Sequence, residues 1–217
     1  MDTPPHPTTI LAFGDSITQA ASQPEDKRWL QLLECELRTR RPGVAVTFVN
    51  AGVGGNTSRE GLARIEPDVL RHRPDVVLIE FGGNDATPDP QRHVPLDEYD
   101  ANLAAIRDRL LSLSRPRLIL LTFPPVIDAW HAWREHPAFA ATGGLDAAVE
   151  PYRQRTRAFA LRHGLPLADI DLALRDSIRR DGPGHGILPD GVHLTAAGNA
   201  VVADTVLPFV LDALDRA

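Results

Sequence analysis

The chain has 217 residues and a net charge of −6, from 23 Lys and Arg against 29 Asp and Glu. Hydrophobic residues make up 43% and charged residues 24%, which is near the globular average and excludes a disordered or fibrous protein. The length predicts one domain over residues 1–217. Because binders of nucleic acid or anionic lipid usually carry a basic surplus, the acidic balance argues against both kinds of partner.

Two residue types that carry chemistry occur once each. Cys35 is the only cysteine, which excludes an intrachain disulfide and a thiolate zinc cluster. It stands between two glutamates, and we expect a half-buried helix residue there, not a reactive thiol. Lys27 is the only lysine, follows no glycine and lies in a charged run, so a phosphate-binding loop and a Schiff-base lysine are both excluded.

The hydropathy pattern bears on membranes and export. No apolar run approaches the ~18 residues of a membrane span, and residues 1–9 lack the apolar core of a signal peptide. We therefore expect no transmembrane span. We also expect a cytoplasmic location for the chain as given, unless an export signal has already been removed.

Short apolar runs alternate with helical patterns along the chain. The five runs cover residues 9–13, 44–49, 76–81, 118–123 and 165–170. They are apolar at both odd and even positions, which predicts strands buried on both faces of a parallel sheet. Between the third and fourth runs, one helix face is predicted from Tyr99, Leu103, Ile106, Leu110 and Leu113, with Asp97 expected to cap that helix.

Other helix boundaries are also visible. Thr57 and Glu60 form a capping-box pattern after the second run, and Pro67 is expected to break or kink the helix that they open. Thr195 is expected to cap a last helix that carries Val202, Val206 and Phe209. Strands that alternate with helices predict an α/β three-layer sandwich.

In such a sheet, ligands bind beyond the carboxyl ends of the strands. Glycine-rich and polar loops follow four of the runs, at residues 14–16, 50–56, 82–85 and 124–125. Ser16 follows the first run closely and should open the next helix, where its backbone N–H is placed to stabilise an oxyanion. The alternative is that Ser16 is an ordinary helix cap.

Three further residues fit the same chemistry. Asp190 precedes His193 by three residues, so its carboxylate can hold one ring nitrogen while the other accepts a serine proton. Gly55 offers an unobstructed backbone N–H, and Asn84 offers a side-chain amide. Both of these residue types also form turns, which is the alternative explanation for each.

These motifs, in this order, resemble the SGNH hydrolases, also called the GDSL esterase/lipase superfamily. The matching blocks are Gly14-Asp15-Ser16-Ile17-Thr18, residues 50–58, Gly82-Gly83-Asn84-Asp85 and Asp190-Gly191-Val192-His193. The resemblance runs from Phe13 to about Gly198, nearly the whole chain.

The resemblance implies a flavodoxin-like α/β/α sandwich with a mainly parallel five-stranded sheet, and hydrolysis of a carboxylic ester. Ser16 would be the nucleophile, His193 the general base and Asp190 the residue that orients it. Ser16, Gly55 and Asn84 would form the oxyanion hole, although Gly54 beside Gly55 leaves open which glycine donates. No metal or organic cofactor is implied.

Parts of the sequence are also compatible with three other functions. Gly52-x-Gly54 is close to a dinucleotide-binding fingerprint, but Thr57 stands where its third glycine is expected. Asp169 and Asp171 could ligate a cation in a metal-dependent enzyme. A non-catalytic binding domain with the same fold is the third alternative.

The resemblance implies a small-molecule ester as the substrate, but the sequence indicates the structure of that ester less strongly. Trp130 and Trp133 follow the fourth run and are expected to line the substrate cleft, although they could instead pack on the core. Asp15 is expected to contact the substrate as well. His131, His136 and His185 are interpreted as solvated loop residues. We favour a short-chain acyl ester, with acetylated carbohydrates included, over the alternatives of a lysophospholipid or a thioester.

Overall fold

The sheet of the computed structural model has five parallel strands in the order β2-β1-β3-β4-β5, which is the flavodoxin-like order. The structure describes residues 7–113 and 115–216. The strands are β1 (Thr8–Gly14), β2 (Val46–Gly52), β3 (Val76–Glu80), β4 (Arg117–Leu121) and β5 (Leu167–Ala168). The predicted parallel sheet is therefore confirmed.

β2 and β5 differ most from their predicted ranges, and the bounds of the other three strands differ by one or two residues. β2 starts at Val46 and continues to Gly52, because it stays paired with β1 until Gly14 lies opposite Gly52. It is an edge strand and is buried only at Val46 and Ala51, so the expectation of burial on both faces is wrong there. β5 is only two residues long, because its pairing with β4 covers only Leu167 and Ala168.

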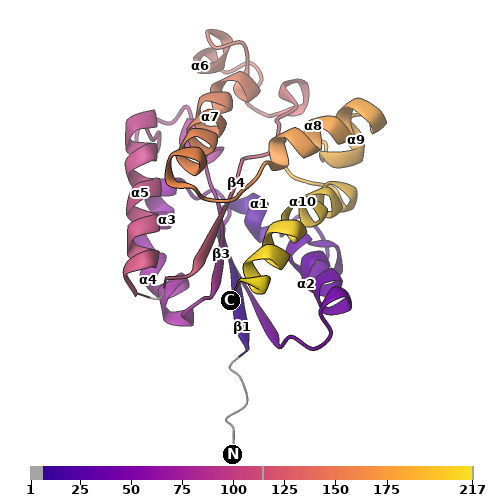
Figure 1. Ribbon diagram of the computed structural model, residues 1–217. Helices are drawn as coiled ribbons and strands as arrows, with labels where there is room; N and C mark the ends of the chain where they lie inside the picture. Colours follow the sequence, from indigo (N-terminus) through magenta and orange to yellow (C-terminus); the bar gives the residue numbers. More distant parts are fainter. Residues whose placement is uncertain (1–6, 114, 217) are drawn as a thin grey trace, which may run out of the picture.

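Helices cover both faces of the sheet, which confirms the three-layer sandwich (Figure 1). α3 (Ser58–Ala63), α5 (Leu96–Leu113) and α7 (Leu145–His163) lie on one side. α2 (Trp29–Arg40) and α10 (Ala196–Asp215) pack together on the other side, with α8 (Ile170–Asp181) against α10. The shorter helices are α1 (Ser16–Gln19), α4 (Ile65–Asp68), α6 (Pro137–Ala140), α9 (Pro183–Gly186), η1 (Glu25–Lys27), η2 (Leu70–His72), η3 (Asn84–Ala86) and η4 (Asp128–Trp130).

Two of the predicted helix starts are confirmed. The Thr57 side chain accepts the Glu60 N–H, and the Glu60 carboxylate accepts the Thr57 N–H at 2.7 Å, so the capping box opens α3. The Thr195 side chain accepts the Gly198 N–H and caps α10. The helix after Thr57 does break, at Arg64, because Pro67 has no N–H to donate to the preceding turn.

The expected cap at Asp97 is wrong. α5 starts one residue earlier, at Leu96, so Asp97 lies within the first turn, where its charge favours the helix N-terminus without capping it. The predicted helix face is buried at Tyr99, Leu103, Ile106 and Leu110. The side chain of Leu113 lies outside the described residues.

Two predictions about apolar surface need correction. Within the described residues, α10 is the helix long and apolar enough to cross a membrane, although no such run was expected. Its apolar side chains pack on α2 and α8, and this accounts for its hydropathy without a membrane. Cys35 is exposed, because the buried stripe of α2 runs through Leu30, Leu33 and Leu37 and leaves residue 35 on the outer face.

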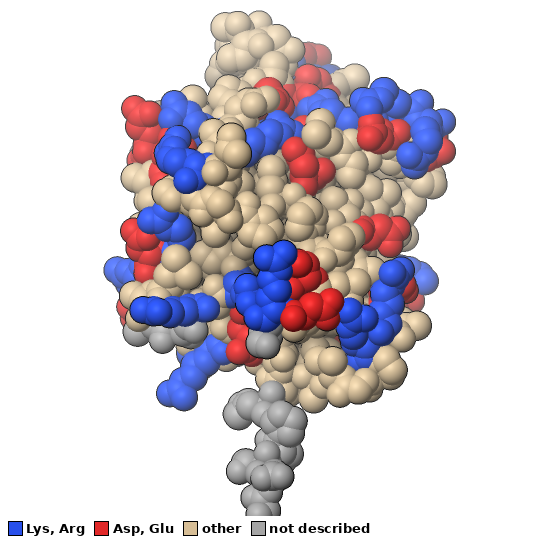
Figure 2. All heavy atoms as spheres, viewed as in Figure 1, with Lys and Arg blue, Asp and Glu red and all other residues tan. Residues whose placement is uncertain are grey.

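Charged side chains of both signs are intermingled on the face that Figure 2 displays. Many are paired along a helix, such as Arg38 with Glu34 and Arg40 with Glu36 on α2. Exposed pairs of this kind typically contribute ~0.3–0.5 kcal/mol each, so they matter more for the character of the surface than for the stability of the fold.

Candidate active site

Ser16 is the first residue of α1, directly after the carboxyl end of β1. The residue that caps this helix is Asp15, whose carboxylate accepts the Ile17 N–H at 2.8 Å. The helix-cap alternative for Ser16 therefore fails. In the described part of the chain no acceptor engages the Ser16 backbone N–H, which leaves it available at the start of the helix.

His193 bridges Ser16 and Asp190. Its Nε2 lies 3.0 Å from the Ser16 Oγ, and its Nδ1 lies 2.8 Å from Asp190 Oδ2. Ser16 and His193 are 177 positions apart and meet because the turn before α10 returns to the end of β1. A ring nitrogen at this distance can accept the serine proton while the carboxylate stabilises the resulting imidazolium.

Asp190 is held as tightly as it holds the ring. Its Oδ1 accepts the backbone N–H groups of Val192 at 3.0 Å and His193 at 2.9 Å. Partial burial alone would raise the pKa of Asp190, but these two N–H groups and the His193 ring outweigh it and lower the pKa. Asp190 is therefore a carboxylate at neutral pH, as an orienting acid must be.

The turn after β2 places two glycines beside Ser16. Asn56 N donates to Val53 O at 3.2 Å, and within this turn Gly55 has φ +79°, a left-handed conformation that favours glycine. Gly54 and Gly55 both line the cavity at Ser16, so the structure does not separate the two candidate donors. No acceptor among the described residues engages the Gly55 N–H.

Asn84 also lines this cavity, but its amide is already in use. Nδ2 donates to Asp15 Oδ2 at 2.8 Å and to the Asn56 carbonyl at 3.2 Å. The bond to Asp15 fixes the orientation of the amide. The longer bond to Asn56 leaves a hydrogen that an incoming oxyanion can share.

The cavity has a volume of about 370 Å³ and mostly apolar walls. Its size is at the lower end of the range for small-molecule sites. Besides Ser16, His193, Asn84 and the glycines, the described residues that line it are Phe123, Val126, His131, Trp133, Leu145, Val149 and Val192. None of these is a Lys, Arg, Asp or Glu.

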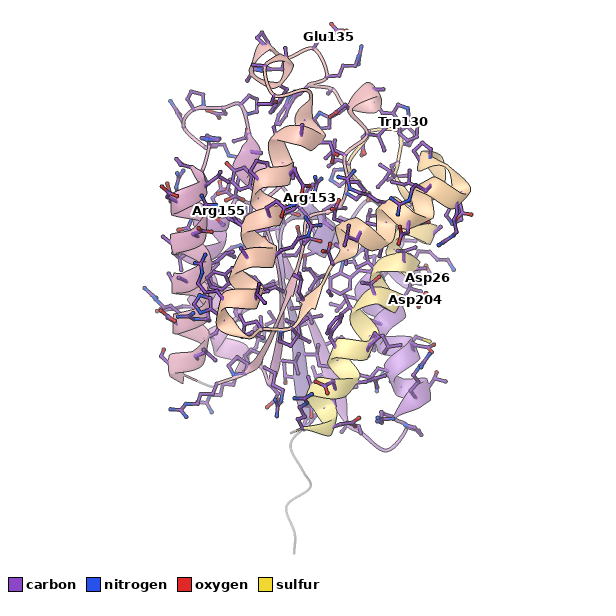
Figure 3. All side chains as sticks on the ribbon, turned by 45° about the horizontal axis from the view of Figure 1, so that its top comes forward. Asp26, Trp130, Glu135, Arg153, Arg155 and Asp204 are labelled. Carbon is purple, nitrogen blue, oxygen red and sulfur yellow. The ribbon has the colours of Figure 1, made fainter. Side chains whose placement is uncertain are left out.

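The three residues expected to contact the substrate lie in different places. Trp133 lines the Ser16 cavity, with its ring stacked on Phe139. Trp130 instead lines a separate hollow beside Gly184 and Leu188, on the side of α8 and α9 (Figure 3). Asp15 is fully buried, so the expectation of substrate contact is wrong for this residue, because capping α1 draws its carboxylate inward.

His131 was missed as a cavity residue. It was interpreted as solvated, yet it is half-buried and lines the cavity opposite His193. Its Nδ1 accepts the Trp133 N–H at 3.1 Å, which leaves the hydrogen on Nε2. Partial burial lowers its pKa, so the ring is neutral at pH 7. The sequence feature that could have indicated a cavity residue is the position of His131 between two tryptophans in a loop after a strand. His136 and His185 are exposed, as expected.

The segment that carries His131 is fixed to the turn that carries His193. Ile127 N donates to the Gly191 carbonyl at 2.8 Å. Gly191 has φ +81°, and a Cβ added there would meet Ile127 O at 2.6 Å and His131 N at 2.9 Å. Only glycine allows this approach, so the cavity wall and the histidine turn are packed backbone to backbone.

Asp169 and Asp171 are held by arginines. Arg157 bonds Asp169 at 2.7 Å and Asp171 at 2.7 Å, and Arg175 bonds Asp171 at 2.8 Å. Arg153, a buried residue of α7, adds a contact to Asp171 on α8 at 3.4 Å (Figure 3). Among the described residues no group of His, Cys, Asp or Glu side chains could hold a metal ion. These carboxylates serve as ion-pair partners for the helices at this end of the sheet.

The dinucleotide alternative meets an obstacle at α3. A phosphate would need the free N–H groups at the start of that helix. The Asp85 carboxylate already accepts the Ser58 N–H at 3.1 Å. In the capping box, the side chains of Thr57 and Glu60 accept each other's backbone N–H groups. Gly52 is needed because a Cβ there would meet the Gln19 backbone nitrogen at 2.3 Å.

The fold and the Ser16–His193–Asp190 geometry are typical of serine ester hydrolases. The chain belongs to the GDSL-like lipase/acylhydrolase family, whose model matches residues 12–201, which confirms the predicted family. An isoamyl acetate-hydrolyzing esterase 1 homolog of Rattus norvegicus is 34% identical over 202 residues, covering 88% of this chain and 76% of the relative.

Solved structures agree with this assignment. A lipase/acylhydrolase from Enterococcus faecalis superposes with a TM-score of 0.76 at 25% identity, covering 94% of this chain and 95% of the other. An acetyl xylan esterase superposes with a TM-score of 0.74 at 26% identity, covering 93% and 99%. The chain is therefore a carboxylic ester hydrolase of the GDSL type.

Proposed function

We propose that the chain hydrolyses small, uncharged carboxylic esters with a short acyl group, through a Ser16–His193–Asp190 triad and an acyl-enzyme. The contact of His193 with both partners, at 3.0 Å to Ser16 Oγ and 2.8 Å to Asp190, carries the proposal. Without this relay the serine hydroxyl would be too weak a nucleophile at neutral pH.

Acylation begins when Ser16 Oγ attacks the ester carbonyl and His193 Nε2 takes its proton. The carbonyl oxygen becomes an oxyanion that accepts hydrogen bonds from the backbone of Ser16, from Gly55 and from the amide of Asn84. When the tetrahedral intermediate collapses, the bond to the alkoxy oxygen breaks and His193 protonates the leaving alcohol. The acyl group stays on Ser16.

Deacylation repeats the cycle with water. His193 removes a proton from the water molecule, whose oxygen attacks the acyl carbon. The second tetrahedral intermediate breaks the bond to Ser16 Oγ, and the proton returns from His193 to the serine. One ester and one water thus give one alcohol and one carboxylic acid, and the triad ends in its starting state.

The walls of the cavity support the proposed substrate class. Phe123, Val126, Leu145 and Val149 offer apolar surface for an acyl group, and the described lining holds no Lys, Arg, Asp or Glu. A phosphate headgroup would find no cation there. This disfavours a lysophospholipid, and relatives whose names specify isoamyl acetate and acetyl xylan support a short acyl group.

The alcohol portion is less constrained than the acyl portion. An acetylated carbohydrate is one candidate, because Trp133 presents an aromatic face at the cavity with 41% of the residue exposed. A thioester is the remaining alternative, since the same residues could attack a thioester carbonyl.

The experiment compares wild type with Ser16→Ala on p-nitrophenyl esters from acetate to palmitate, with acetylated sugars and an acyl thioester alongside. We expect activity on acetate and butyrate, little on palmitate, and none in the variant. A fluorophosphonate should label wild type but not Ser16→Ala, whereas Ser22→Ala should be labelled normally. Labelling that persists in Ser16→Ala would place the nucleophile elsewhere, and preference for palmitate would reject the short-acyl assignment.

A further inference from the structure

Two buried carboxyl groups lie beneath the Ser16 turn. Asp15 is 0% exposed, and Glu80, the last residue of β3, is 1% exposed. The two side chains are neighbours, because the backbone N–H of Asp15 donates to Glu80 Oε2 at 3.5 Å. No Lys, Arg or His side chain among the described residues forms an ion pair with either group. Neither Asp15 nor Glu80 was predicted to belong to the triad or to the oxyanion hole.

The two carboxyl groups have different partners. Asp15 accepts from the Ile17 N–H and from the Asn84 amide, each at 2.8 Å. Glu80 Oε2 accepts from the Thr18 hydroxyl at 3.0 Å and from the Asp15 N–H at 3.5 Å, whereas Oε1 is buried and has no hydrogen-bond partner. Both oxygens of Asp15 thus accept a short hydrogen bond, as a carboxylate requires, whereas one oxygen of Glu80 accepts none.

The backbone is built to permit this close approach. A Cβ added at Gly14 would lie 2.1 Å from Thr18 Oγ1, 2.5 Å from the Glu80 carbonyl oxygen and 2.9 Å from Glu80 Oε2. The glycine of the first sequence block therefore makes room for the Glu80 side chain under the nucleophile turn. The carboxyl group is enclosed by neighbours that cannot easily move.

We propose that Glu80 is a neutral acid whose carboxyl hydrogen is donated to the Asp15 carboxylate, and that this bond positions the Asn84 amide for the oxyanion. In this arrangement Glu80 acts only through Asp15 and Asn84. It is a positioning residue, separated from the reacting carbonyl by three hydrogen bonds in series, through Asp15 and Asn84.

Electrostatics supports the location of the proton. Burial, and then the charge of Asp15, raise the pKa of Glu80 well above its ordinary value. Burial also raises the pKa of Asp15, to about 6, although its hydrogen bonds oppose the rise. The charges of Asp15 and Asp85 also repel each other, so that Asp15 raises the pKa of Asp85. His193 has the opposite effect, because its charge favours the carboxylate form of Asp15. Adjacent buried carboxyls do not both ionise, and at neutral pH Asp15 carries the charge.

The first arm of the test compares Glu80→Gln with Glu80→Leu on p-nitrophenyl acetate. A glutamine amide can donate permanently where the neutral acid does, so kcat should stay within about threefold of wild type. Leucine cannot donate, so kcat should fall at least tenfold with little change in KM, although by less than the factor of about 10²–10³ for losing an oxyanion donor outright. A glutamine variant as impaired as the leucine variant would mean that Glu80 acts as a charged carboxylate and would overturn the proposal.

The second arm needs no turnover and therefore stays informative if the leucine variant does not fold. The infrared spectrum of wild type at pH 8.5 should contain the C=O stretching band of a protonated carboxyl group. That band should be absent from Glu80→Gln. Absence of the band from wild type, or its persistence in the variant, would overturn the proposal.

The catalytic part of this inference rests on the proposed function, but the two can fail separately. If Ser16→Ala keeps its activity, the proposed triad is wrong whatever the infrared band shows. If Ser16→Ala is inactive and the band is missing from wild type, the triad stands and the neutral Glu80 is rejected.

Discussion

The carboxylate of Asp190 holds His193 through two different atoms. Oδ1 accepts the backbone N–H of His193 at 2.9 Å, and Oδ2 faces ring Nδ1 at 2.8 Å. One side chain thereby fixes both the turn that carries the histidine and the tautomer of its ring. With the hydrogen on Nδ1, the Nε2 lone pair faces Ser16, which is the state a general base needs.

Replacing this acid by its amide should keep the turn but lose the tautomer. In Asp190→Asn the amide oxygen can still accept the backbone N–H groups, but Nδ2 would donate to Nδ1 and leave the hydrogen on Nε2. We expect kcat for p-nitrophenyl acetate to fall by about 10⁴ with the melting temperature little changed. A kcat within tenfold of wild type would show that another group orients His193.

Asn84→Ala tests the side-chain donor of the oxyanion hole. If the amide stabilises the tetrahedral oxygen, kcat should fall by about 10²–10³, equivalent to about 2.7–4 kcal/mol of barrier. KM should change little, because this donor matters most where charge has developed. If Asn84 serves only to join Asp15 to Asn56, the variant should lose stability and keep its kcat. Steady-state kinetics and thermal melting on the same variant distinguish the two outcomes.

A chelator should leave the enzyme active. Asp169 and Asp171 are bound by Arg157, with Arg175 also on Asp171, and in the proposed mechanism Ser16 and His193 provide the nucleophile and the base. We expect unchanged turnover after dialysis against EDTA. Loss of turnover that one divalent cation restores would show that these carboxylates exchange their arginine partners for a metal ion.

Asp85 should make the protein less stable as the pH rises through neutrality. Burial raises the pKa of this carboxyl to about 7, although hydrogen bonds from Ser58 oppose the rise. The unfolded group has a pKa of about 3.9, so between these values the folded state holds a proton that the unfolded state releases. The free energy of unfolding should therefore fall as pH rises from about 4 to about 7.

Asp85→Asn isolates this contribution. The asparagine cannot ionise, so the stability of the variant relative to wild type should increase between pH 4.5 and pH 8, measured by urea unfolding. Asp97→Asn is the matched control, because it removes a carboxylate that is 95% exposed and leaves Asp85 in place, so it should not reproduce this increase. A difference for Asp85→Asn that is constant or falls with pH would contradict the assignment.

The sequence predicted most of the sheet, because runs such as 76–81 are buried on both faces and apolar throughout. It also placed Ser16 at the start of a helix, since a strand, a glycine and a capping residue stand together there. The bounds of β2 were predicted less accurately, because this edge strand is held by its pairing with β1 and not by burial of apolar side chains. Cys35 and Asp97 were misplaced because a shift of one or two residues changes the face or the cap of a helix.

The cavity itself was harder to predict. His131 reaches it through the path of a loop, and no spacing in the sequence encodes that path. Asp15 stands beside the proposed nucleophile, yet its side chain turns inward to cap α1 and hold Asn84. Substrate contact was predicted for Asp15 because it is next to Ser16 in the sequence, but its side chain is buried. The contact between Glu80 and Asp15 could not be predicted from the sequence, because 65 positions separate the two residues and only the fold brings them together.

The backbone contact between Ile127 and Gly191 limits how this enzyme can be re-engineered. Insertions or deletions around residues 127–133 would enlarge the cavity only by displacing the histidine turn, so selectivity and turnover would change together. Leu145 and Val149 line the same cavity from α7, and among the described residues no hydrogen bond joins this helix to that turn. Libraries aimed at longer acyl chains are therefore best directed to the helix, and the loop is best kept at its present length.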